Sequence, residues 1–110
     1  MRSYVIDEIS PQDMESLRVF LKENALPSDL EEIFWVRVPE DILSDVQFQH
    51  RDCRPHVFAV ELGGDWMKLE FFIRTLSGMR CTCQSYCTPQ QRDFIVRFAD
   101  SAVTALGIRT

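Results

Sequence analysis

The chain has 110 residues, of which 45% are hydrophobic and 26% charged, and these proportions are typical of a globular protein rather than a disordered one. Its length fits one domain, residues 1–110, with a core that needs no obligatory cross-link. The formal net charge of −5 argues against sequence-independent binding to nucleic acid, because such binding depends on Lys and Arg side chains that neutralise phosphates.

The sequence also lacks the signals of a membrane or secreted protein. No apolar run approaches the roughly 20 residues that span a bilayer, and the stretch "MRSYVIDEIS" has no apolar core of a signal peptide. We therefore expect a cytoplasmic location and no membrane partner. In that compartment the four cysteines should be reduced, unless they bind a metal or carry out redox chemistry.

Acidic residues are concentrated in the first half of the chain. Six of the 17 lie between Asp29 and Asp45. This segment is either a solvated acidic face or a docking surface for a basic partner.

The first half of the chain predicts a strand, a helix and a second strand. Residues 3–9 read as a short strand, and Ser10 followed by Pro11 is typical of a helix start. That helix is expected to run to about Asn24 with one apolar stripe. "IFWVRV", residues 33–38, is rich in β-branched and aromatic residues and predicts a strand. Residues 39–55 show a weaker pattern, with one helical turn and a loop.

A hairpin is predicted where two alternating apolar runs flank Gly63-Gly64, a pair typical of a two-residue turn. That turn pairs Val60 with Met67 and puts the apolar partners of both strands on one face.

A second hairpin is predicted around residues 76–78, where a glycine in third position suits a three-residue loop. This loop pairs Ile73 with Cys81 and Phe71 with Cys83. A two-residue loop would exchange the faces of the last strand, so the hydrophobic pattern favours the three-residue loop.

The last element is a helix that begins with a capping box at Thr88 and stops at Gly107. Together these elements predict an α+β domain. Its antiparallel sheet has four to five strands, in the order β-α-β-β-β-β-α, with two helices packed on one face.

Three interpretations of the clustered cysteines remain open. In the register above, Cys81 and Cys83 point into the core and pack as small hydrophobic residues. Zinc holds its sulfur ligands about 3.8 Å apart, whereas same-face strand neighbours have Cα atoms about 6.6–6.8 Å apart, so "CTC" in a regular strand would be a strained chelate. Cys87, just before a helix, is the candidate for a reactive thiol.

The metal interpretation adds the segment "HRDCRPH", which carries both histidines of the chain and the remaining cysteine. Its spacing matches no standard zinc pattern. Zinc is the metal that Cys and His ligands favour, and the candidate ligands are His50, Cys53, His56, Cys81, Cys83 and Cys87.

The second face of the predicted sheet is amphipathic, with aromatic side chains between charges, a composition typical of interfaces. Loop 39–55 could cover this face, a small ligand could bind it, or a partner or second copy of the chain could pack on it. The candidate interface residues are Val57, Trp66, Lys68, Phe72, Arg74 and Tyr86.

The sequence contains no phosphate-binding glycine loop, metalloprotease motif or nucleophile elbow. We therefore expect a non-enzymatic domain that self-associates as a homodimer or binds a protein partner, without a cofactor. The alternative is a metal- or thiol-dependent protein that uses the Cys and His residues to bind zinc or to carry out redox chemistry.

Overall fold

The computed structural model describes residues 1–76 and 81–110. The helices are α1 (Pro11–Asn24), α2 (Asp45–Gln49) and α3 (Pro89–Ala105), with two short 3-10 helices, η1 (Glu40–Ile42) and η2 (Arg51–Cys53). The strands are β1 (Ser3–Ile6), β2 (Leu26–Pro27), β3 (Ile33–Arg37), β4 (His56–Leu62), β5 (Met67–Glu70), β6 (Phe72–Thr75) and β7 (Ser85–Tyr86). Among the described residues, no helix combines the length and apolarity that a bilayer span requires.

The seven strands found among the described residues form one open sheet, in which β1, β5, β4, β3 and β2 are neighbours in that order and β6 pairs with both β4 and β7. The pairs between these strands are antiparallel. The predicted α+β class and antiparallel sheet are confirmed. The predicted count of four to five strands and their order differ from the structure for two reasons. Strand β2 has only two residues and shows no alternation, and the strand predicted between the two turns is interrupted at Phe71, which divides it into β5 and β6.

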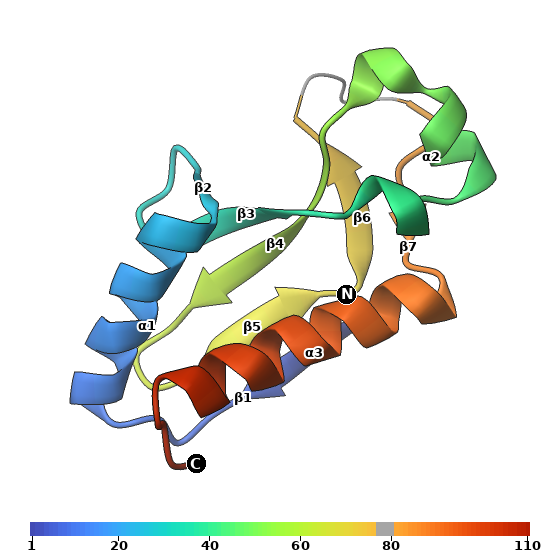
Figure 1. The fold of residues 1–110 in the computed structure, drawn as a ribbon. Coiled ribbons are helices and arrows are strands. Elements are labelled where there is room, and N and C mark those ends of the chain that lie inside the picture. Colours follow the sequence, from blue (N-terminus) through green and yellow to red (C-terminus); the bar gives the residue numbers. More distant parts are fainter. Residues whose placement is uncertain (77–80) are drawn as a thin grey trace.

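Helices α1 and α3 lie on the same side of the sheet (Figure 1). The fully buried Leu17, Phe58 and Ile95 belong to one hydrophobic cluster, so both helices and the sheet share a core. Phe58 of β4 also packs edge-on against two rings of α3, Phe94 at 6.2 Å and Phe98 at 5.9 Å between centroids. The prediction that two helices pack on one face is confirmed for these two long helices.

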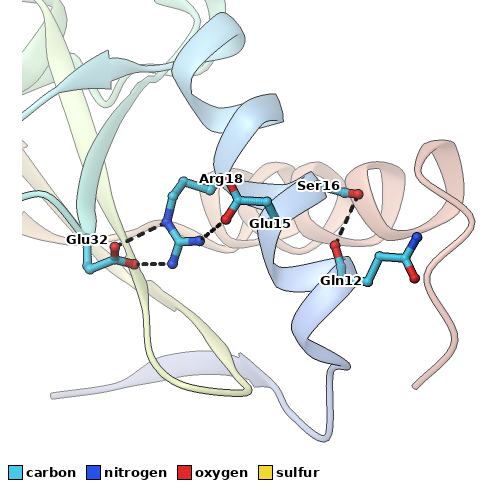
Figure 2. Close-up of polar contacts among 5 residues, drawn as sticks. All are labelled: Gln12, Glu15, Ser16, Arg18 and Glu32. Carbon is cyan, nitrogen blue, oxygen red and sulfur yellow. Dashed lines mark hydrogen bonds and ion pairs between the residues drawn. The ribbon is translucent and has the colours of Figure 1, made fainter.

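The start of α1 follows its local sequence. The Ser10 hydroxyl accepts a hydrogen bond from the Asp13 backbone N–H, and Pro11 occupies the first turn. Arg18 then fixes the helix to the segment before β3, because its guanidinium donates to both carboxylate oxygens of Glu32 at 3.1 and 2.8 Å and also to Glu15 at 2.8 Å (Figure 2). Part of the acidic segment therefore has a structural role.

Both ends of α3 match the sequence prediction. Thr88 and Gln91 exchange the two hydrogen bonds of a capping box. At the other end Gly107 adopts a φ of 65°, and the N–H of Ile108 donates to the carbonyl of Val103. This backbone geometry favours glycine and ends the helix.

The hairpin between β4 and β5 forms, but with a register two residues from the prediction. Val60 pairs with Leu69 rather than with Met67, which pairs with Leu62. The longer turn lets the indole ring of Trp66 pack on Gly63, where an added Cβ would lie 1.9 Å from the ring. A shift of two residues keeps each side chain on its predicted face.

The predicted strand through the two cysteines at 81 and 83 is wrong. Strand β6 pairs with β7 through Ile73 and Ser85, four residues beyond the predicted partner, and the cysteines lie in the turn before β7. The second and third residues of the predicted three-residue loop, 77 and 78, lie outside the described residues.

Candidate metal centre

The candidate site lies at one end of the sheet, where the segment with η1, α2 and η2 meets the chain that leads into β7 (Figure 1). Ser44 begins α2 with a capping box, in which its hydroxyl accepts from the Gln47 N–H and the Gln47 side chain accepts from the Ser44 N–H. Helix α2 ends at Gln49 with His50 as its C-cap, and the single turn η2 follows, with the Cys53 N–H donating to the carbonyl of His50 at 3.1 Å. This turn brings the side chains of His50 and Cys53 to the same side.

The other two ligand candidates come from the turn that replaces the predicted strand. The N–H of Gln84 donates to the Cys81 carbonyl at 3.3 Å, and the Cys83 backbone donates to the sulfur of Cys81. The chain therefore curls around Cys81 instead of extending. The strain argument against a Cys-x-Cys chelate does not apply here, because it assumed the spacing of an extended strand.

The four side chains converge closely enough to hold a metal ion. One ligand atom from each of His50, Cys53, Cys81 and Cys83 lies within 4.8 Å of every other. His50 Nδ1 lies 2.8 Å from the sulfur of Cys81 and 4.0 Å from that of Cys53, and the two sulfurs are 3.4 Å apart. These distances bracket the edge of a tetrahedral Zn–S/N site, which is about 3.5–3.8 Å. Three sulfurs and one imidazole are a ligand set typical of structural zinc.

The three sulfurs differ in proton affinity. Hydrogen bonds from the backbone and thiol of Cys83 lower the pKa of Cys81 to about 6. Burial, followed by the hydrogen bond with Cys81, raises the pKa of Cys83 to about 12. The pKa of Cys53 is also raised, chiefly by its hydrogen bond with Cys81. The cluster therefore concentrates negative charge on Cys81, and a divalent cation would lower all three pKa values because thiolates are the ligands.

Buried amide side chains support the site from the core side. Gln47 Nε2 donates to the carbonyl of Cys83 at 3.1 Å, and Gln91 Nε2 donates to Gln47 Oε1 at 2.8 Å and to the carbonyl of Ile42 at 3.0 Å. Both glutamines are 1% exposed. The role of these two glutamines was not predicted from the sequence, although the S-x-x-Q pattern at Ser44 is a signal for the start of α2.

Four of the six predicted metal ligands are thus brought together, and two are not. His56 lies in β4, opposite Thr75, and is 2% exposed. Cys87 precedes α3 and packs against the hydrophobic core, and burial raises the pKa of its thiol. Neither residue belongs to the cluster.

The predicted interface residues lie on the sheet face opposite α1 and α3. Tyr86 is exposed, whereas Val57 is fully buried and presents no surface. The other four are partly exposed, and they are Trp66, Lys68, Phe72 and Arg74. Salt bridges join Lys68 to Glu61 and Arg74 to Glu70, so the charges of these two predicted interface residues are compensated within the chain.

Searches of this chain against protein-family models, curated proteins and solved structures find no match.

Proposed function

We propose that this protein is a zinc-binding domain in which His50, Cys53, Cys81 and Cys83 hold one Zn²⁺. The main support for the proposal is that the four ligand atoms lie within 4.8 Å of one another. The residues come from two segments about 30 positions apart, so their closeness is a result of folding and not of neighbouring positions in the chain. With four protein ligands, the coordination shell is closed. A closed shell has a structural role, because catalytic zinc keeps a position for water or substrate.

The same sulfurs could instead serve redox chemistry, since those of Cys53 and Cys81 are 3.4 Å apart. Zinc is favoured because a disulfide uses only two of the four convergent side chains, and it leaves the imidazole of His50 and the buried thiol of Cys83 without a role. The metal gives all four the same role.

The proposal is tested by the zinc content of the purified protein, refolded with excess Zn²⁺ under reducing conditions and then freed of unbound metal. We expect one zinc per chain in the wild type and in Cys87→Ser, the matched control that changes a thiol outside the cluster. Cys83→Ser should bind less than a tenth as tightly. A wild-type chain without zinc, or a Cys83→Ser chain that binds as tightly as the wild type, would contradict the proposal.

As a second function, we propose that the sheet face opposite α1 and α3 mediates self-association. Its support is the exposure of large side chains there: Val5 at 50% and Tyr86 at 39%, beside the partly exposed Trp35, Trp66 and Phe72. A zinc-stabilised scaffold that presents an aromatic surface would then act as a binding module, not as an enzyme.

The second proposal is tested by the molar mass in solution, measured by light scattering during size exclusion. We expect a dimer for the wild type and a folded monomer for Trp66→Glu combined with Phe72→Glu. Val19→Glu, at an apolar position of α1 that is 47% exposed, is the control and should remain dimeric. A monomeric wild type would reject self-association through this face.

A further inference from the structure

A cavity of about 350 Å³ lies where three segments of the chain meet, and it contains none of the four proposed zinc ligands. Phe71, between β5 and β6, joins the segments through its backbone. Its N–H donates to the carbonyl of Arg2 at 3.0 Å, and its carbonyl accepts from the N–H of Cys87 at 2.9 Å. Main-chain hydrogen bonds therefore hold the walls of this cavity together. The lining residues are Arg2, Ser3, Phe71, Tyr86, Cys87 and Arg92.

The cavity is lined by two positive charges and by no carboxylate. Among the described residues, neither Arg2 nor Arg92 forms an ion pair, and no Asp or Glu lines the cavity. Both arginines are exposed, so a ligand from solution has access to them. Two uncompensated guanidinium groups around one concavity favour an anion.

The two positive charges act on the same point, the sulfur of Cys87. Burial has the largest effect on the pKa of this thiol and raises it, whereas the charges of Arg92 and Arg2 act in the opposite direction. Both guanidinium groups are therefore close enough to Cys87 for their fields to overlap in the cavity. Because burial prevails, the thiol stays protonated and does not neutralise the arginines.

The guanidinium of Arg2 is positioned by an aromatic ring. It lies over the ring of Tyr86, 4.0 Å from the centroid, and the ring of Phe72 packs edge-on against Tyr86 at 5.2 Å. A guanidinium stacked in this way keeps the N–H groups at its edge available to an anion. The first turn of α3 contains no acidic residue, so the positive end of this helix adds to the field of the arginines.

The charge and size of the cavity define the ligand that fits it. Two arginines and no acidic residue give a formal charge of +2, and a phosphate monoester carries about −1.5 to −2 near pH 7 on three acceptor oxygens. Guanidinium and hydroxyl groups are donors to such oxygens. A phosphate group fills only part of about 350 Å³, and the rings of Phe71 and Tyr86 bound the space that remains.

We infer that this cavity binds a phosphate monoester whose organic group is aromatic. The phosphate oxygens accept from the guanidinium groups of Arg2 and Arg92 and from the hydroxyl of Ser3. The aromatic group contacts Phe71 and Tyr86, and the two negative charges neutralise the lining.

The test is a titration of the full-length protein near pH 7, after refolding with Zn²⁺ under reducing conditions and removal of unbound metal. Amide shifts are followed by ¹H–¹⁵N NMR at constant ionic strength. The probes are phenyl phosphate, inorganic phosphate, and phenyl sulfate, which has nearly the same shape as phenyl phosphate but one negative charge. We expect saturable shifts at Ser3, Cys87 and Arg92 with phenyl phosphate. Phenyl sulfate should bind about tenfold more weakly because it lacks the second charge, and inorganic phosphate about tenfold more weakly because it lacks the ring.

A further probe distinguishes two sources of the same chemical group. N-acetyl-phosphotyrosine amide carries the aryl phosphate on an amino acid. Tighter binding than that of phenyl phosphate would assign the site to a phosphotyrosine side chain of a peptide. Equal or weaker binding would assign it to a small free aryl phosphate.

Matched variants separate this site from general charge effects. Arg2→Gln and Arg92→Gln should each weaken the binding of phenyl phosphate about tenfold, because each removes a charge-assisted donor. Arg97→Gln removes the same charge from an exposed position of α3 outside the cavity, and it should change the affinity less than about twofold. All three variants should keep the circular dichroism of the wild type.

Four results would each overturn the inference. They are the absence of saturable shifts, phenyl sulfate binding as tightly as phenyl phosphate, inorganic phosphate binding as tightly as phenyl phosphate, and equal losses of affinity in Arg92→Gln and Arg97→Gln.

Discussion

The three thiols of the candidate centre differ in their protonation. Cys81 is the acidic thiol, with a pKa of about 6, whereas burial and hydrogen bonding keep the Cys83 thiol protonated. Metal binding must remove the protons that remain, because the thiolate is the ligand. The number of protons released therefore reports which sulfurs bind.

We predict that zinc binding near pH 7 releases about two protons, because Cys81 is already largely thiolate there while Cys53 and Cys83 are protonated. Protons compete with the metal, so the apparent affinity should fall about a hundredfold for each unit that the pH is lowered around neutrality. Calorimetric zinc titrations in buffers with different ionisation enthalpies measure the number of protons released. Release of one proton or fewer would mean that the buried thiol of Cys83 is not a ligand.

At the element scale, α2 and η2 are short and depend on the contacts that surround them. Helix α2 has five residues, fewer than an isolated helix needs for stability. It is held by its capping box and by the buried Gln47, which connects it to Cys83 and to Gln91 of α3. This helix therefore links the candidate centre to the core.

Gln47→Ala should lower the free energy of unfolding by about 1–3 kcal/mol, because the buried carbonyl of Cys83 loses its donor and Gln91 Nε2 keeps only its bond to the carbonyl of Ile42. Gln49→Ala changes an exposed residue of the same helix and should cost under about 0.5 kcal/mol. Denaturant titration of both variants with saturating zinc measures the difference. Equal losses of stability in Gln47→Ala and Gln49→Ala would show that the hydrogen bonds of Gln47 do not support the site.

Elements with local signals could be predicted from sequence, and those fixed by tertiary contacts could not. Ser10, Thr88 and Gly107 each carry a cap or stop that acts within one turn, and both long helices have the predicted ends. The register of the β4–β5 hairpin instead depends on the packing of Trp66 against Gly63, which no pattern of alternation reveals.

The residues of the candidate centre were predicted from the sequence, but their arrangement in space was not. All four convergent residues belonged to the predicted set, yet the argument against a chelate assumed that "CTC" was a strand. No local feature distinguishes Cys83, which faces the cluster, from Cys87, which packs on the core. That distinction depends on the meeting of two distant segments.

At the scale of the whole molecule, the main core is separate from the candidate centre. The buried cluster is built from the sheet, α1 and α3, and among the described residues it contains no side chain of α2 or η2. Seventeen buried residues contribute to it, and fully burying a large apolar side chain is worth roughly 1.5–3 kcal/mol. The fold as a whole should therefore persist without metal.

A strong chelator should release residues 44–55 and 81–87 while leaving the sheet and the long helices in place. Hydrogen exchange followed by mass spectrometry should show lost protection in those two segments, with little change in α1, β4 and α3. Cys83→Ser should show the same pattern with and without chelator. Global loss of protection would mean that the metal stabilises the entire fold, as in a zinc finger.

X-ray absorption at the zinc edge identifies the atoms that bind the metal. The zinc-loaded protein should show three sulfurs at about 2.3 Å and one nitrogen at about 2.0–2.1 Å, with imidazole scattering from His50. A shell of oxygen and nitrogen alone, a shell of two sulfurs, or four sulfurs with no imidazole would contradict the assignment of the site to His50, Cys53, Cys81 and Cys83.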